Sequence, residues 1–369
     1  MKVVLVSHHA LPHVGGLEIL VDKEVRALVA AGHSVVHITS DLGGAGHLPP
    51  YPPGATLLRI RSWNPIERFL HLAYPLFSPR LLTTLWRESK AADVVHVHGF
   101  IYMSSLVAVV VAALRGKPRI LTDHGAIQTY HTPIATLAAR AASETIGRVN
   151  CRLATKVVAY NQRVLSVISR LNGGRSPAAF VPYPVDETVF HPAAPEVRRR
   201  LRQELGWPDD PKTVLFVGRL NPDKGADLLV RTPDPDRYRI VICGPGDPSI
   251  LGDLSNRPDV SVLAPRPQSE IRDLYQAADV VAVPTVPGRE GFPLVAREAL
   301  ACGTPVVLAY EPGYEPYRNV RGLRFVERTS SGLHAGIVAA LSDAVPLPAL
   351  PADDPLTPSA ERWIEMIYA

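Results

Sequence analysis

Cysteine is scarce in this chain, and the three residues present stand far apart. Cys151, Cys243 and Cys302 form no Cys-x-x-Cys pair and have no histidine at metal-ligand spacing. The sequence therefore predicts neither a disulfide framework nor a zinc site. A reducing cytoplasm is the expected location.

Long apolar runs are also missing. The longest, residues 104–116, is far below the ~20 residues that cross a bilayer, so no transmembrane helix is expected. The first residues contain one lysine and several β-branched residues but no cleavage site, which favours a buried strand over a signal peptide. A Gly-x-Gly-x-x-Gly fingerprint is absent as well, which argues against a dinucleotide cofactor and against NAD-dependent oxidoreduction.

Charge is present but unevenly distributed. Residues 1–185 hold 19 Lys and Arg against 9 Asp and Glu, whereas residues 186–369 hold 20 against 26. A basic half suits an anionic membrane surface or an acidic acceptor, and attraction between the two halves across a cleft explains the asymmetry equally well. No nucleic-acid partner is expected.

The order of the apolar runs predicts two α/β domains. Short runs such as KVVLVS, SVVHITS and ADVVHVHG alternate with helical segments, and the same pattern restarts at TVLFVG. Strands that are apolar on both faces suit a parallel sheet covered by helices, so each half is expected to be a doubly wound, Rossmann-like domain. Proline-rich stretches place the domains at residues 1–184 and 185–352, followed by a terminal helix within 353–369 that packs back on the first domain.

Ligands of open α/β sheets bind at the carboxyl ends of the strands, so the loops there are the candidate sites. After the first strand, Gly15 and Gly16 precede a helix whose N–H groups favour an anion such as phosphate, although a tight turn is the simpler explanation of two glycines. Asp123 and His124 end another strand, where a structural histidine and a ligand-contacting histidine are evenly balanced.

Two cations follow the first strand of the second domain. Arg219 and Lys224 lie five residues apart in FVGRLNPDKGADLL, with Asn-Pro-Asp turning the chain between them. A planar guanidinium and a compact ammonium that converge on one loop suit a pyrophosphate. Solvated surface charges are the alternative.

The stretch EGFPLVAREALACGTPVV supplies a further candidate loop, which begins at Glu290. Phe292, Pro293 and Leu294 are expected to start a helix, with proline at its first position because proline has no N–H to leave unpaired there. The N–H groups of Gly291 and its neighbours then form a second anion site.

The same helix carries Glu298. Its i, i+4 spacing from Leu294 and Cys302 predicts that it lies on the buried face of the helix, where a carboxylate needs partners. A diol such as ribose would donate hydrogen bonds to it. A salt bridge to Arg297 or Arg266 is the alternative.

Together these motifs resemble glycosyltransferase family 4, whose members are retaining enzymes with the GT-B fold, two Rossmann-like domains that face a cleft. The resemblance covers nearly the whole chain, and its most specific parts are GGLE, VHVHG, TDHG, GRLNPDKG, YQAADVVAVPT and EGFPLVAREALACGTPVV. In that family two glutamates separated by seven residues hold the nucleotide sugar, and the spacing from Glu290 to Glu298 matches. The short segment after Lys224 departs from the family pattern, and the GPGD turn at 244–247 only approximates it.

The resemblance implies which residues bind the nucleotide. Arg219 and Lys224 would neutralise the donor diphosphate, and Gly16 would face it from the first domain. Glu298 would bind the ribose hydroxyls, while Arg266 is a weaker candidate for contact with the base.

The resemblance also implies which residues surround the donor sugar. Glu290 and His124 are the catalytic candidates, the first bracing the sugar and the second positioning it. Backbone contacts to sugar and phosphate would come from Gly291, Phe292, Pro293 and Leu294.

The implied reaction is transfer of a hexose-type sugar from a nucleoside-diphosphate sugar to a hydroxyl acceptor, with retention through a front-face route. Cations and helix N-termini would stabilise the leaving diphosphate, so neither a metal nor a cofactor is expected. A nucleotide-sugar epimerase of the same architecture and a catalytically silent sugar-nucleotide-binding protein are the alternatives.

The acceptor is expected to be lipid-linked, part of a cell-envelope polysaccharide, or a small-molecule glycoside. Residues 62–86 are apolar and aromatic and include Arg68 and Arg80, with Arg87 directly after them. This composition suits peripheral docking on the inner face of an anionic membrane, and a buried helical segment explains it equally well.

Overall fold

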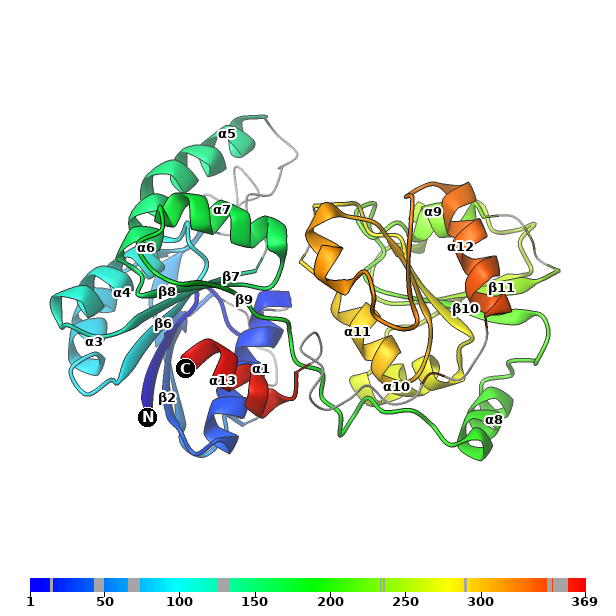
Figure 1. Cartoon of the computed structure of the whole chain (residues 1–369), viewed down its shortest axis with the longest axis horizontal. Coiled ribbons are helices and arrows are strands. Elements are labelled where there is room, and N and C mark those ends of the chain that lie inside the picture. The colour runs from blue at the N-terminus through cyan, green and yellow to red at the C-terminus, as the bar shows by residue number, and fades with distance from the viewer. Residues whose placement is uncertain are drawn as a thin grey trace. The chain divides into compact units, whose positions relative to one another are not determined.

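The chain folds into two units, each built on its own parallel sheet (Figure 1). The computed structural model describes residues 1–13, 16–42, 50–65, 74–124, 133–232, 234, 236–288, 291–343, 347 and 358–369. The first unit contains Met1–Pro182 together with Ala360–Ala369, and the second contains Tyr183–Ser359. The domain boundary that the sequence predicted, between residues 184 and 185, lies two residues C-terminal to this one.

The first unit has a seven-stranded sheet whose neighbouring strands are all parallel. Its strands, in spatial order, are β3 (Ala55–Ile60), β2 (Ser34–Ser40), β1 (Lys2–Val6), β6 (Val94–His98), β7 (Arg119–Asp123), β8 (Lys156–Ala159) and β9 (Ala178–Phe180). The central strands are buried on both faces, as their continuous apolar runs predict. The order reverses between β1 and β6, so this is the point where a ligand is expected at the carboxyl edge.

Helices of the first unit follow the strands in the pattern that parallel connections require. They are α1 (Gly16–Ala30), α3 (Arg80–Glu88), α4 (Met103–Leu114), α5 (Pro133–Ala142), a π-helical turn η1 (Ser143–Gly147), α6 (Arg148–Leu153) and α7 (Gln162–Asn172). A short antiparallel pair, β4 (Ser62–Trp63) and β5 (Leu76–Phe77), lies outside the main sheet. Helix α7 shows both expected end signals: the side chain of Asn161 accepts from the N–H of Arg163 at 2.7 Å, and Gly173 is left-handed.

The second unit has a six-stranded parallel sheet. Its strands, in spatial order, are β12 (Val260–Leu263), β11 (Tyr238–Cys243), β10 (Lys212–Val217), β13 (Val280–Val283), β14 (Val306–Ala309) and β15 (Leu323–Val326). Its helices are α8 (Pro195–Glu204), α9 (Ala226–Val230), α10 (Gln268–Ala277), α11 (Leu294–Ala301) and α12 (Ser330–Ser342), with 3₁₀ turns η2 (Pro248–Leu251) and η3 (Pro312–Tyr317). Here the strand order reverses between β10 and β13.

The terminal helix α13 (Ala360–Tyr368) belongs to the first unit and packs against α1, which confirms that the end of the chain returns to this unit. Trp363, Ile364 and Ile367 are its buried residues. The side chain of Lys156 donates to the carbonyl oxygen of Met366 at 3.0 Å, and this contact satisfies an acceptor in the last turn of the helix.

None of the helices in the described part of the chain has the length and apolar character needed to cross a bilayer. The predicted doubly wound α/β architecture is confirmed in both units.

Candidate functional site

The two predicted cations lie at the strand reversal of the second unit. Arg219 and Lys224 follow β10, and residues 284–288 follow β13, so the loops on the two sides of the reversal carry both candidate motifs. The Arg219 side chain is exposed and Lys224 is half-buried. The turn between them is fixed by the Asn221 side chain, which accepts from the N–H of Lys224 at 3.1 Å.

The loops after β10 and β13 are tied together by their backbones. The N–H of Val286 donates to the carbonyl oxygen of Asp223 at 2.8 Å. Gly225 is left-handed at φ +75°, and a Cβ there would overlap the carbonyl oxygen of Pro284. The position of Lys224 is therefore coupled to the loop that leads into α11.

The GPGD turn packs against the same strand end. A Cβ on Gly244 would overlap the carbonyl oxygen of Gly218, so only glycine allows this approach. The N–H of Leu220 donates to the carbonyl oxygen of Pro245 at 2.7 Å. The turn thereby supports the segment that carries Arg219.

Two tyrosines of η3 shape the segment that begins at Gly291. The hydroxyl of Tyr314 donates to the carbonyl oxygen of Gly291 at 2.8 Å, and the ring of Phe292 stacks on Tyr317 with the centroids 3.8 Å apart. The carboxylate of Glu311, which is buried after β14, accepts from the N–H of Gly288. No prediction from the sequence included Glu311, Tyr314 or Tyr317, although their position after a buried strand is a usable signal.

Helix α11 starts one residue later than predicted. Leu294 is its first residue, and Pro293 lies at the N-cap rather than at the first helical position. Proline in that place still has no N–H to satisfy, and it restricts the preceding residue, Phe292, to extended backbone. The first N–H groups of α11 lack partners within the helix, which is the property of an anion-binding end.

The prediction that Glu298 lies on the buried face of α11 is wrong in detail. Ala296, Ala299 and Leu300 form the buried side, and Glu298 is half-buried at its edge. Small alanines allow α11 to approach β13 and β14 closely, and the longer side chains of Leu294 and Glu298 are half-buried.

Arg297 and Arg266, the two alternatives for a salt bridge with Glu298, each contact another side chain. The hydroxyl of Tyr275 donates to Glu298 at 3.1 Å, whereas the guanidinium of Arg297 donates to the hydroxyl of Tyr317 at 2.6 Å. Arg266, the weak candidate for base contact, pairs with Glu270 of α10 at 2.9 Å. Ligand-facing roles for Glu298 and Arg266 stay predictions.

In the first unit the structure places Gly16 at the first position of α1 and His124 directly after β7. The Nε2 atom of His124 lies 3.0 Å from Nδ1 of His98 at the end of β6. Burial, with a smaller contribution from the charge of His96, lowers the pKa of His124 to about 3. This imidazole is therefore neutral at physiological pH and offers hydrogen bonds rather than positive charge. Glu290, the other catalytic candidate, lies outside the described residues, as does Gly15.

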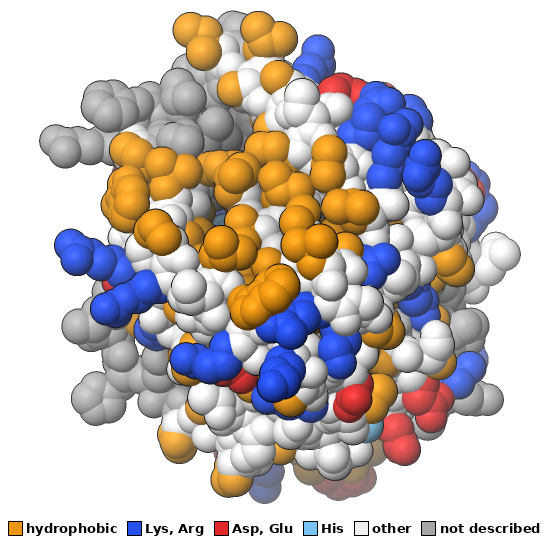
Figure 2. Space-filling model, turned by 90° about the vertical axis from the view of Figure 1, so that its left-hand side faces the viewer, with side chains coloured by type: hydrophobic (Ala, Val, Ile, Leu, Met, Phe, Trp, Pro, Cys, Tyr) orange, Lys and Arg blue, Asp and Glu red, His pale blue; other side chains and the backbone are white. Residues whose placement is uncertain are grey.

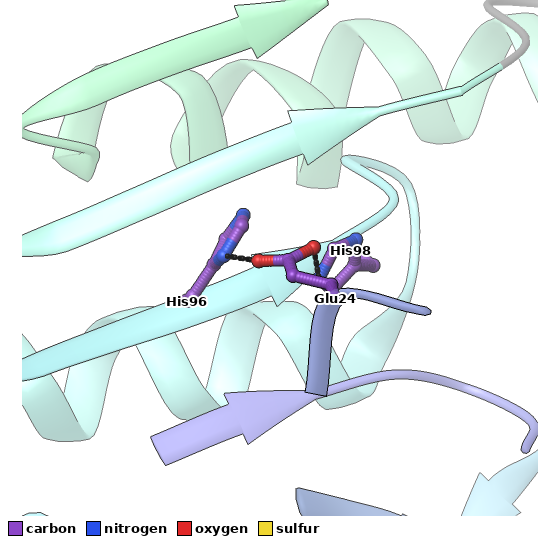
Figure 3. A group of neighbouring side chains, drawn as sticks. All are labelled: Glu24, His96 and His98. Carbon is purple, nitrogen blue, oxygen red and sulfur yellow. Dashed lines mark ion pairs between the residues drawn. The ribbon is translucent and has the colours of Figure 1, made fainter. Parts of the chain in front are cut away.

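A buried polar cluster stands behind His98. Figure 3 shows the Glu24 carboxylate paired with the imidazoles of both His96 and His98, and the two contacts measure 2.8 and 3.4 Å. The hydroxyl of Tyr368 in α13 donates to the same carboxylate at 2.7 Å. The cluster thus connects α1, β6 and the terminal helix, and His98 continues it to His124.

The two parallel sheets, each with polar loops at its carboxyl edge, define a chain of the two-domain GT-B fold class. Solved structures agree on the fold: the chain superposes with a TM-score of 0.68 on sucrose-phosphate synthase from Thermosynechococcus elongatus, at 20% identity over 100% of this chain and 94% of that one. Anabaena HepE in complex with UDP gives a TM-score of 0.69 at 17% identity, with 100% and 94% coverage.

Sequence comparison identifies the family. Residues 14–189 match Glycosyltransferase Family 4, and residues 197–346 match Glycosyl transferases group 1. A D-inositol 3-phosphate glycosyltransferase of Xylanimonas cellulosilytica is 31% identical over 343 residues, which cover 84% of this chain and 80% of the relative. The corresponding protein of Corynebacterium glutamicum is 28% identical over 351 residues, with the same coverage. The chain therefore belongs to glycosyltransferase family 4 and is a glycosyltransferase that uses a nucleotide-sugar donor.

Proposed function

We propose that this enzyme transfers a hexosyl group from a nucleoside-diphosphate sugar to a hydroxyl acceptor, with retention of configuration and without a metal ion. The observation that carries the proposal is the strand reversal of the second unit, where Arg219, Lys224 and the start of α11 follow β10 and β13. A doubly wound sheet binds its ligand at this place.

The diphosphate is the group that these residues suit best. A sugar leaves its nucleotide as an anion, and preorganised positive charge stabilises that anion in the transition state. The backbone beside Lys224 is held by the contact between Asp223 and Val286, so the ammonium extends from a fixed loop. Arg219 is exposed and adds a planar guanidinium that can bind two phosphate oxygens. In this proposal the two side chains and the N-terminus of α11 do the work of a metal.

The remaining candidates are assigned around the donor. Glu298 binds the ribose hydroxyls while Tyr275 holds its carboxylate from the other side. The backbone of residues 291–294, braced by η3, contacts the sugar and phosphate. Glu290 braces the sugar, and neutral His124 donates or accepts a hydrogen bond to it. Gly16 faces the diphosphate.

The acceptor hydroxyl belongs to a lipid-linked, cell-envelope or small-molecule glycoside in this proposal. The relatives named above act on D-inositol 3-phosphate, so this compound is the first soluble acceptor to assay. UDP-glucose is the first donor, because the solved structure of Anabaena HepE was obtained with it.

A donor screen followed by two matched variants tests the proposal. Unfolding midpoints with UDP, GDP and ADP sugars identify the donor, since a ligand at 100 times its dissociation constant stabilises by about 2.7 kcal/mol. Lys224→Gln is expected to lower kcat/KM by about 10²- to 10³-fold, in line with the loss of one preorganised charge. Arg231→Gln removes an exposed charge from the same unit and serves as the control.

Four results would contradict the proposal. A product with inverted anomeric configuration by NMR rules out the retaining route. Turnover of the donor without an acceptor indicates the epimerase, and donor binding without turnover under any acceptor indicates the silent binding protein. Loss of activity on dialysis against a chelator, restored by a divalent cation, rules out the metal-free mechanism.

A further inference from the structure

One face of the first unit exposes an unusual amount of apolar surface. Twelve large hydrophobic residues in the described part of the chain are exposed, and eleven of them lie in the first unit, with only Val262 in the second. Six form what is called here the apolar face: Leu82 and Trp86 of α3, Val110 and Leu114 of α4, and Ile134 and Leu137 of α5. Figure 2 shows hydrophobic side chains gathered across this side of the molecule.

The apolar face is a consequence of how the helices pack. Leu81 and Leu85 are the buried residues of α3, so Leu82 and Trp86, one position further on, point away from the core. Helix α4 is apolar on all sides: Ala108, Val109 and Ala112 are buried, while Leu114 is 71% exposed. A helix that is apolar all round normally has neighbours on all sides. Among the described residues, none covers the outward side of α4 at Val110 and Leu114, although its apolar sequence suits a packed neighbour there.

Positive charge surrounds the apolar face. Helices α3 to α6 carry five arginines, which are Arg80, Arg87, Arg140, Arg148 and Arg152, against two glutamates, a balance of +3. Arg115 and Lys117 follow α4 directly and raise it to +5. Figure 2 shows Lys and Arg side chains around the hydrophobic patch.

The two glutamates on these helices are already paired with cations. Glu144 accepts from Arg148 and from Arg170, the latter at 2.6 Å, and Glu88 lies 2.9 Å from Arg87 and 3.4 Å from Lys2. No carboxylate on these helices therefore offsets the remaining arginines. Apolar side chains flanked by unopposed arginines are complementary to a membrane surface with acidic headgroups.

Trp86 is an exposed apolar side chain with a cation beside it. The residue is 45% exposed, and the guanidinium of Arg115 lies 3.8 Å from the centroid of its ring. Tryptophan favours the boundary between headgroups and acyl chains, and arginine beside it reaches the phosphates while its stem stays apolar. The pair is suited to the interface rather than to bulk water.

We infer that the apolar face docks this enzyme on an anionic phospholipid membrane. The sequence predicted such a surface within residues 62–86, with Arg68 among its charges. Arg68 lies outside the described residues. In the structure the apolar face is formed by α3, α4 and α5. Docking would extend the proposed function, because a docked enzyme has a lipid-borne acceptor within reach. The docking itself rests on the proposed function only for the identity of that acceptor.

Vesicle sedimentation of the full chain tests the docking without an enzyme assay. Wild type is expected to bind vesicles of phosphatidylcholine with phosphatidylglycerol, to bind phosphatidylcholine alone weakly, and to be released by salt, because exposed charges are screened within about 10 Å at 0.1 M. Leu114→Gln with Leu137→Gln is expected to weaken binding by about 100-fold or more, because two aliphatic side chains no longer enter the apolar phase. Arg80→Gln with Arg140→Gln should weaken binding about fivefold per charge.

Matched controls separate docking from misfolding. Both leucines are about 70% exposed, so their replacement should leave the unfolding midpoint unchanged. Val262→Gln and the pair Arg199→Gln and Arg200→Gln make the same changes on exposed positions of the second unit and should bind as wild type does. A vesicle-induced blue shift of tryptophan emission that disappears in Trp86→Phe places the contact on α3.

Three outcomes would overturn the inference. The first is absence of binding by wild type to anionic vesicles, and the second is equal binding by wild type and the leucine variant. The third is a concentration-dependent dimer that the leucine variant abolishes, which would make the apolar face an interface between two copies of the chain. Activity on a soluble acceptor together with no vesicle binding would refute the docking and leave the proposed reaction intact.

Discussion

Acidification should destabilise the first unit through histidines that are buried without charge. His37 is enclosed between the hydroxyls of Ser7, at 2.8 Å, and Tyr51, at 2.5 Å, and burial, with a smaller effect of Arg59, lowers its pKa to about 3. The pKa of His124 is lowered to a similar value. Both imidazoles stay neutral in the folded unit at a pH where an unfolded chain would protonate them.

The size of the effect follows from proton linkage. A histidine whose pKa falls from 6.5 to about 3 on folding leaves stability at its full value above pH 6.5 and reduces it as the pH drops toward 3. Each pH unit costs about 1.4 kcal/mol per histidine, so at pH 5 each has removed about 2 kcal/mol. The two together remove about 4 kcal/mol, a large share of the roughly 5 to 15 kcal/mol that holds a domain folded. His8 and His98, whose pKa values burial also lowers, act in the same direction.

Urea unfolding at several pH values measures this loss. Trp363 is buried in the first unit, and Trp207→Phe removes the single tryptophan of Tyr183–Ser359, so fluorescence of that variant reports the first unit. The free energy of unfolding should fall by about 4 kcal/mol or more between pH 7 and pH 5. Replacing His37 and His124 by glutamine should remove about half of that dependence or more, whatever the replacement does to stability at pH 7. An undiminished fall in the double variant would refute the assignment.

Three further predictions concern single contacts. Tyr317→Phe removes the hydroxyl that accepts from Arg297, a buried guanidinium, and should lower the free energy of unfolding of the second unit by about 1.5–3 kcal/mol in urea titrations. Glu298→Gln should raise the KM for the donor about 10- to 100-fold with little change in kcat if it binds ribose, and an unchanged KM would remove that role. Tyr368→Phe takes away a hydrogen bond to the buried Glu24 carboxylate and should cost the first unit about 1.5–3 kcal/mol, measured by the same fluorescence.

The sequence predicted the parts of this protein that depend on local pattern. Apolar runs bounded by turn residues gave both sheets, and the rule that ligands bind at carboxyl edges selected the loops of Arg219 and Lys224 before their strands were ordered. The sequence could not supply the spatial order of the strands. That order shows that these two loops flank the reversal of the second sheet.

The parts that sequence reasoning missed depend on contacts between distant residues. Glu311, Tyr314 and Tyr317 follow one strand yet hold a loop about twenty residues earlier, and their own spacing shows no feature of a site. Glu298 was placed correctly on α11 but at the centre of its buried side rather than at the edge, because helical spacing gives the relation between residues and not the direction of the sheet. The apolar face was assigned to one segment, whereas packing builds it from three helices.

The Glu24 cluster contains residue types that bind zinc, yet its geometry predicts that it does not. Two histidines and a carboxylate are the ligands of many zinc sites, and the side chains of Glu24, His96 and His98 meet in the core of the first unit. The distances between these side chains favour hydrogen bonds instead. Nδ1 of His96 lies 2.8 Å from the Glu24 carboxylate and 2.7 Å from the hydroxyl of Tyr368. Two tetrahedral ligands, each about 2.0–2.1 Å from zinc, would stand roughly 3.3 Å apart. Zinc would have to push these atoms apart and break the contact that holds α13. We therefore expect the unfolding midpoint of wild type to be the same in zinc and in chelator, and a rise with zinc that Glu24→Gln abolishes would show that the cluster is a metal site.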